Sequence, residues 1–176
     1  MSLLGQVAAV LKEAGIPFAA VGGIALAVRG VARSTFDVDL LTMDTRCLDA
    51  GIWRPVEKAG ASVEIRRGDA DDPLTGVVRI RQKGERPVDI VVGRSVWQAD
   101  AIARAEPLLV LDALVPIVRS SDLVLLKLFA GGPQDAWDIG QLLRADADGT
   151  LVANVENALP RLPRHAATLW QRIRSG

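Results

Sequence analysis

The sequence predicts an α+β fold, in which a mixed β-sheet with flanking helices is followed by a C-terminal helical segment. Two observations lead to this prediction. In residues 1–118, stretches with aliphatic residues at helical spacing alternate with short runs of β-branched and aliphatic residues, and glycine, proline and acidic turns separate these runs. From Ser121 onward the spacing is helical, with no internal repeat and no low-complexity linker.

Glycine and proline mark the ends of the individual elements. Gly15 is a natural C-cap for the first helix, and Pro17 starts an extended run. Gly22 and Gly23 form a turn into a short helix that Gly30 closes. The helices predicted on this basis cover residues 2–14, 24–29, 47–58, 95–105 and 121–129, and the strands cover residues 17–21, 37–41, 62–67, 77–82, 88–92, 107–111 and 114–118.

Composition predicts a single domain over residues 1–176, with the sheet in residues 1–118 and the helical segment in residues 119–176. The chain has 176 residues, of which 49% are hydrophobic and 24% charged, enough for one well-buried core. One cysteine excludes an internal disulfide, and one histidine excludes a histidine-rich zinc site. We therefore expect Cys47 to be an inert packing residue.

Charge and the N-terminal residues point to a cytoplasmic protein without a membrane partner. Residues 1–15 contain a short apolar run followed by Lys12 and Glu13, with no basic leader, so they predict neither a signal peptide nor a membrane span. The formal net charge of +0 provides no global attraction to nucleic acid. Any RNA contact would have to come from a local patch.

Two acids at alternate positions form the first candidate site. Asp37 and Asp39 belong to an apolar segment that reads as a strand, and side chains two residues apart on a strand point to the same side. Both carboxylates can therefore bind one cation. Because Gly22 and Gly23 precede them, the pattern predicts a metal-dependent phosphate site.

A third acid, Asp89, interrupts the apolar strand 88–92. A buried, unpaired carboxylate costs several kcal/mol, so such a residue takes up a proton, pairs with a cation or binds a metal ion. Oxygen ligands alone favour Mg²⁺, which is completed by water and substrate phosphates. The alternative is that Arg79 or Arg81 neutralises Asp89.

Four short motifs follow one another in a set order. They are Gly22-Gly23, Arg33-x-Thr35, Asp37-x-Asp39 and the isolated Asp89. This order resembles the nucleotidyltransferase superfamily, whose fold is that of the catalytic domain of DNA polymerase β. Within it, the chain looks most like the AbiEii-type toxins, because an apolar helix contains Lys127 and the next helix starts with Asp135-x-x-Asp138. Relatives often have an arginine where this chain has Gly132, which puts any phosphate contact of that arginine in doubt here.

The resemblance implies a Mg²⁺-dependent enzyme that moves a nucleoside monophosphate from a triphosphate such as ATP to a hydroxyl group. Its acceptor would be an RNA end, a protein or a small molecule, and its partner a cognate antitoxin. Two Mg²⁺ ions, or Mn²⁺ as an alternative, would stabilise the entering and leaving oxygens. The catalytic and metal-binding residues would be Asp37, Asp39 and Asp89, and the nucleotide-binding residues Gly22, Gly23, Arg33, Thr35 and Lys127.

Each of these assignments has a structural alternative. Lys127 is equally consistent with a lysine that extends from a buried helix to the solvent, and Asp135 and Asp138 with acids that cap a helix start. Arg79 and Arg81 alternate on one strand face, which is more typical of a solvated sheet than of a nucleic-acid track. Two other functions stay open: a catalytically silent module that binds a nucleotide or a partner, and a DNA- or RNA-binding regulator.

Overall fold

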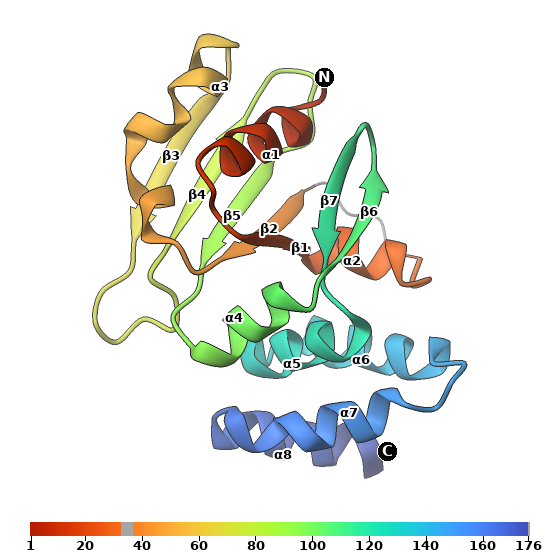
Figure 1. Cartoon of the computed structure of the whole chain (residues 1–176). Helices are drawn as coiled ribbons and strands as arrows, with labels where there is room; N and C mark the ends of the chain where they lie inside the picture. Colours follow the sequence, from red (N-terminus) through yellow and green to blue (C-terminus); the bar gives the residue numbers. More distant parts are fainter. Residues whose placement is uncertain (33–36, 176) are drawn as a thin grey trace. The chain divides into compact units, whose positions relative to one another are not determined.

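A computed structural model of the chain describes residues 1–32 and 37–175. The strands form one seven-stranded sheet in the order β3-β4-β5-β2-β1-β7-β6 (Figure 1). Its strands are β1 Phe18–Val21, β2 Val38–Thr42, β3 Ser62–Arg67, β4 Gly76–Arg81, β5 Val88–Val92, β6 Glu106–Val110 and β7 Ala113–Ile117. The helices are α1 Leu3–Glu13, α2 Gly22–Val28, α3 Arg54–Lys58, α4 Val96–Ala103, α5 Ser120–Ala130, α6 Pro133–Ala145, α7 Leu151–Ala158 and α8 Arg164–Ser175.

Both kinds of strand pairing occur, which confirms the predicted mixed sheet and its fold class. Strand β2 pairs in parallel with β5 and antiparallel with β1, while β4 pairs antiparallel with β5. Parallel pairing of β2 and β5 joins Val38 with Val88, a separation long enough for the crossover connection that parallel strands require. Across the central strands β1, β2 and β5, Val21, Asp39 and Asp89 therefore lie side by side.

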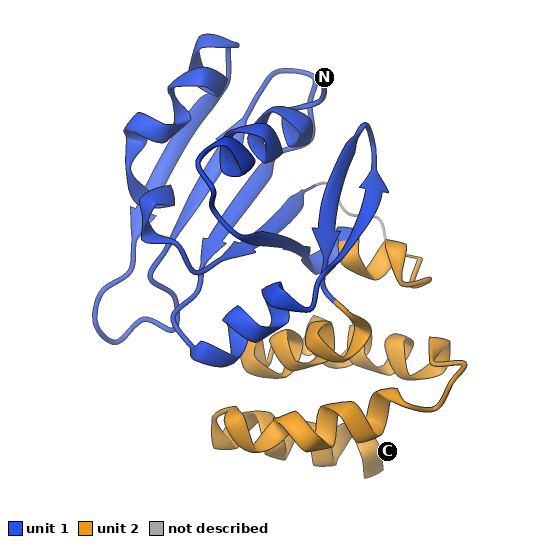
Figure 2. Cartoon of the chain, viewed as in Figure 1, with its two compact units in different colours: residues 1–24, 34–118 blue, residues 25–33, 119–176 orange. Residues whose placement is uncertain are grey.

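The chain divides into two compact units (Figure 2). Unit 1 comprises Met1–Ile24 and Ser34–Val118, and contains the sheet with α1, α3 and α4. Unit 2 comprises Ala25–Arg33 and Arg119–Gly176, and contains α5 to α8. That the whole chain behaves as a single domain stays a prediction.

Alternation of side chains gives the sheet of unit 1 one buried face. Its central positions include Val78, Ile90 and Leu40, each fully buried. Helix α1 contacts β5 and β7, and α3 contacts β3, so these helices cover that face (Figure 1). The side chains between these positions point to the opposite face, which has charged residues such as Arg79 and Asp89 as well as the buried Leu41.

One predicted helix is wrong. In place of one helix over residues 47–58, the structure has two 3₁₀ turns, Thr45–Leu48 and Ala50–Trp53, followed by the short α3. Asp49 interrupts the helix with an extended backbone (φ −95°, ψ 121°), and its side chain accepts a hydrogen bond from the Gly51 N–H. This local cap competes with helical hydrogen bonding. The Trp53 Nε1–H donates to the Cys47 carbonyl at 2.8 Å, which ties the two turns together.

Helix α5 is the centre of unit 2, since it contacts α6, α7 and α8. It ends at Gly131, whose positive φ of 72° makes it a left-handed C-cap. Leu123 and Leu128 are among its buried residues. In the described part of the chain, every helix is too short or too polar to cross a membrane.

Candidate active site

Two of the predicted acids, Asp39 and Asp89, lie in one row across the sheet. Arg79 lies opposite Asp89 in the β4–β5 pair, Asp89 lies opposite Asp39 in the β5–β2 pair, and Glu64 lies opposite Arg79 in the β3–β4 pair. Residues in register on neighbouring strands point to the same face, about 4.8 Å apart. We call Glu64, Arg79, Asp89 and Asp39 the polar row. Two carboxylates predicted from separate strands are thus neighbours.

Gly22 lies directly against the Asp39 carboxylate at one end of the polar row. A Cβ atom at position 22 would stand 2.9 Å from Cγ and 3.1 Å from Cβ of Asp39, and closer still to its Oδ2. The backbone φ of Gly22 is also positive, at 62°. Only glycine meets both requirements. The glycine turn and the second acid of the motif therefore form one packed unit.

Arg79 binds Asp89 through two nitrogen atoms. Arg79 Nε donates to Asp89 Oδ1 at 3.0 Å and to Oδ2 at 3.1 Å, and Nη2 donates to Oδ2 at 2.7 Å. The Asp89 side chain is 10% exposed and that of Arg79 is 39% exposed. A neighbouring arginine, the alternative partner considered for Asp89, is therefore present, and it is the more exposed residue of the pair.

Asp37 lies just before β2 and is exposed. Its negative charge reaches Arg79: the pKa of Arg79 is raised by its hydrogen bond with Asp89 first, then by the charge of Asp89, and further by the charges of Glu64 and Asp37. Arg79 is thus a cation in the field of three acids.

The three predicted metal ligands do not form a ready-made cluster. Among residues 1–32 and 37–175, no group of three or more His, Cys, Asp or Glu side chains is arranged to hold a metal ion. Mg²⁺, however, is commonly held by one or two carboxylates together with water and substrate phosphates. The adjacent Asp39 and Asp89 supply this hard oxygen donor set, so the residues fit the ion.

Lys127 of α5 is buried among acids within unit 2. Its Nζ lies 2.6 Å from Asp138 Oδ2 and 3.1 Å from Asp135 Oδ1, and its side chain is 8% exposed. The alternative in which Lys127 extends from its helix to the solvent is therefore wrong. Asp135 also accepts the Gly132 N–H, as predicted for a helix cap, whereas Asp138 is fully buried and binds Lys127 and Gln134. Nucleotide binding by Lys127, and a functional role for the two acids, stay predictions.

Of the remaining predicted residues, the structure describes Gly23. Gly23 continues α2 directly after Gly22. Arg33 and Thr35 lie outside the described residues.

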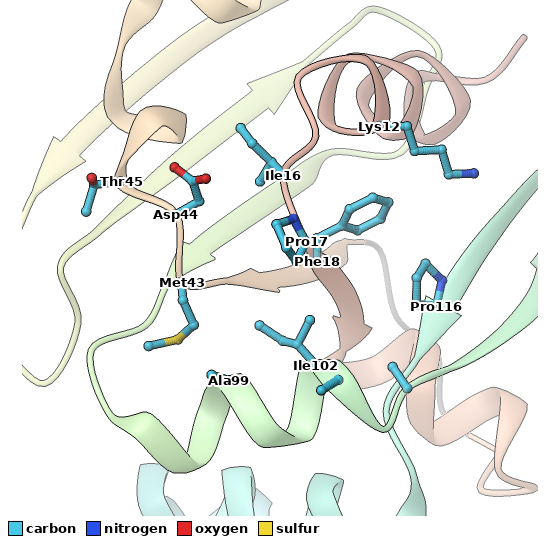
Figure 3. Close-up of a pocket in the computed structure, with 12 residues that line it drawn as sticks. Lys12, Ile16, Pro17, Phe18, Met43, Asp44, Thr45, Ala99, Ile102 and Pro116 are labelled. Atoms are coloured by element: carbon cyan, nitrogen blue, oxygen red, sulfur yellow. The ribbon is translucent and has the colours of Figure 1, made fainter.

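A pocket that sequence reasoning missed opens in unit 1 near the start of β1 (Figure 3). Its volume is about 810 Å³. Most of its lining is apolar, as Phe18, Met43 and Ile102 illustrate, with Lys12 and Asp44 as charged members. Asp44 is already bound by Arg46 at 2.6 Å. No sequence motif marks this pocket, because its walls come from separate segments of the chain.

Comparisons with known proteins support the fold. No family model and no curated protein matches the sequence. The antibiotic-resistance factor ANT(2'')-Ia is similar in structure, with a TM-score of 0.57 and 15% identity over 97% of this chain and 95% of that chain. TM1012 of Thermotoga maritima, a candidate nucleotidyltransferase, has a TM-score of 0.55 and 16% identity over 79% of this chain and 89% of its own.

A third structure agrees with these two. An antigenic nucleotidyltransferase-like protein from Paracoccidioides brasiliensis has a TM-score of 0.52 and 16% identity over 93% of this chain and 88% of that chain. The chain therefore has a nucleotidyltransferase fold, as predicted. Its resemblance to the AbiEii-type toxins stays a prediction.

Proposed function

We propose that this chain is a divalent-cation-dependent nucleotidyltransferase, which moves a nucleoside monophosphate from a nucleoside triphosphate to a hydroxyl group. The observation that carries the proposal is the placement of Asp39 and Asp89 side by side on parallel strands, with Gly22 packed against Asp39. The nucleotidyltransferase fold supports it.

The chain's own residues have distinct roles in this proposal. Asp39 and Asp89 would hold Mg²⁺ or Mn²⁺, and Asp37, from its position before β2, would complete the acid set. The bound cation would offset the charge of the phosphates and of the leaving pyrophosphate. Asp89 would also accept the proton of the attacking hydroxyl. Gly22 and Gly23 would let the backbone approach the phosphates, with Arg33 and Thr35 as further phosphate contacts.

Three classes of acceptor belong to the proposal: an RNA end, a protein hydroxyl and a small molecule. ANT(2'')-Ia is an antibiotic-resistance factor whose chain is matched over 95% of its length, which favours including small molecules. A toxin role with a cognate antitoxin is a further part of the proposal. It predicts that expression of the wild-type chain arrests growth and that expression of Asp39→Asn does not.

Transfer of label from nucleotide tests the proposal. Each of the four α-labelled triphosphates is incubated with the chain and Mg²⁺, with total RNA, cell extract or a panel of antibiotics as acceptor. We expect labelled product from the wild type and a loss of at least about 100-fold in Asp39→Asn, because a misplaced catalytic group costs this much. Asp71→Asn, in an exposed turn, is the matched control and should keep wild-type activity. Equal amounts of labelled product from the wild type and Asp39→Asn would refute the proposal that the chain is an enzyme.

The Arg79–Asp89 pair favours one alternative, a catalytically silent module that binds a nucleotide or a partner. If Arg79 neutralises Asp89 permanently, the row has no need of a cation. This alternative predicts nucleotide binding that is unchanged when EDTA removes divalent cations. The proposal of a cation-dependent enzyme predicts that EDTA weakens nucleotide binding.

A further inference from the structure

We propose that Arg79 is an exchangeable counter-ion: it pairs with Asp89 in the absence of a divalent cation and leaves Asp89 when the cation binds. This inference rests on the proposed function, because it concerns the cation site of the same polar row. It makes Arg79 a positioning residue that sets how tightly the cation binds.

The geometry of the pair makes the two states mutually exclusive. Arg79 uses both oxygen atoms of Asp89, at 2.7 to 3.1 Å. A cation shared between Asp39 and Asp89 needs at least one of these oxygens. The guanidinium and the divalent cation would also repel each other at such a short distance. Cation binding therefore has to move Arg79.

Three features allow Arg79 to move. Its side chain is 39% exposed, so it can leave without crossing the core. A hollow of about 150 Å³, lined by Glu64, Arg66, Val77 and Arg79, lies beside it. The Glu64 carboxylate, which also binds Arg66 at 2.7 Å, is in register with Arg79 on the neighbouring strand, and its charge already contributes to the raised pKa of Arg79. The guanidinium thus has room and an acid on its other side.

The need for a counter-ion follows from the acids themselves. Asp39 and Asp89 are neighbours across β2 and β5, and the charge of Asp37 reaches the same guanidinium. Like charges at this separation destabilise the fold unless a cation offsets them. Arg79 provides that charge in the cation-free chain, and a bound cation provides it afterwards.

Calorimetric titration of the full chain with Mn²⁺ tests the exchange. Arg79→Gln removes the competitor, so we expect it to bind Mn²⁺ about tenfold tighter than the wild type, the change expected when one charge-assisted pair no longer opposes binding. Arg81→Gln is the matched control, since Arg81 is on the same strand and face and its Nη1 lies 3.9 Å from Glu64 Oε2. It should bind within about twofold of the wild type.

An Asp89→Asn background shows whether the effect passes through Asp89. In that background, Arg79→Gln should change the Mn²⁺ affinity less than it does in the wild type, since the pair is already broken and only the repulsion between guanidinium and cation remains. A second readout follows Arg79 itself: in Mg²⁺ titrations observed by NMR, the Arg79 Nε–H resonance should shift while that of Arg81 stays in place. If thermal melting shows that Arg79→Gln is unfolded, Arg79→Lys replaces it. Lysine cannot form the two-nitrogen contact, so it should also bind Mn²⁺ more tightly than the wild type.

The outcomes separate this inference from the proposed function. If the wild type binds Mn²⁺ and the Arg79 variants bind it no tighter, the exchange is refuted and the enzyme proposal stands. If neither the wild type nor any folded variant binds Mn²⁺, with or without triphosphate, both are refuted.

Discussion

Replacing Gly22 by alanine tests the packing at the centre of the candidate site. Two costs are expected. The first is backbone strain, because a residue with a side chain at φ 62° loses about 1–2 kcal/mol. The second is a steric clash with Asp39, whose Cγ and Cβ atoms would lie 2.9 Å and 3.1 Å from the new Cβ. Rotation of the carboxylate alone does not relieve the contact with Cβ. We estimate the clash at about 1–3 kcal/mol, as for other overpacked sites.

Gly15 supplies a control with the same strain and no clash. Its φ is also 62°, and no atom lies within 4 Å of a Cβ built there. Gly15→Ala should therefore lose only the strain, about 1–2 kcal/mol. The difference between the two variants measures the contact with Asp39.

Urea denaturation followed by circular dichroism provides the free energies of unfolding. We expect Gly22→Ala to be less stable than Gly15→Ala by about 1–3 kcal/mol, and this difference to shrink when Asp39→Ala is present in both proteins. If Gly22→Ala and Gly15→Ala are equally stable while Asp39 is unchanged, the reasoning is refuted. The close approach of position 22 to the Asp39 side chain would then have no energetic consequence.

Two further predictions concern buried polar groups. Lys127→Met removes the cation 2.6 Å from the fully buried Asp138, and should lower the free energy of unfolding in urea by about 3–5 kcal/mol. Asp135→Asn, at a side chain that is 23% exposed, should lower it by about 1 kcal/mol. Similar losses in the two variants would contradict this prediction. Burial raises the pKa of Cys47 from 9.0 to about 12, so between these pH values the thiol stays neutral in the folded chain and ionises in the unfolded chain. The free energy of unfolding should therefore fall by about 1.4 kcal/mol per pH unit as the pH rises from 9.0 toward 12. Cys47→Ala should lack this component, and an unchanged pH profile in that variant would exclude Cys47 as its source.

Local sequence patterns predicted most of the elements within one or two residues. Strands β3 and β5 have the predicted bounds, and α1 starts after the Ser2 cap and ends before Gly15. These signals are local, because alternation, helical spacing and caps depend on neighbours in the chain. The failure at residues 47–58 is also local: the Asp49 side chain competes for backbone donors, and helical periodicity does not reveal that competition.

For the candidate site too, the sequence predicted some features and could not predict others. The acids Asp37, Asp39 and Asp89 could be chosen from sequence, because a charge in an apolar strand needs a partner. Which partner Asp89 takes could not be chosen, since Arg79 and Arg81 have the same strand face and the sequence does not contain the β4–β5 register. Lys127 was likewise recognisable as a lone charge on an apolar helix, but its contacts with Asp135 and Asp138 depend on how α5 packs against α6.

By itself, the sequence determined the fold class, the order of the elements and the identity of the charged residues that need an explanation. Only the tertiary structure decided that Asp39 adjoins Asp89, that Arg79 binds Asp89 with two nitrogens, and that Gly22 has no space for a side chain. The physical reason is the range of the interactions. Hydrogen-bond caps and periodicity act within a few residues, whereas strand register is determined by pairing between segments that are distant in the chain.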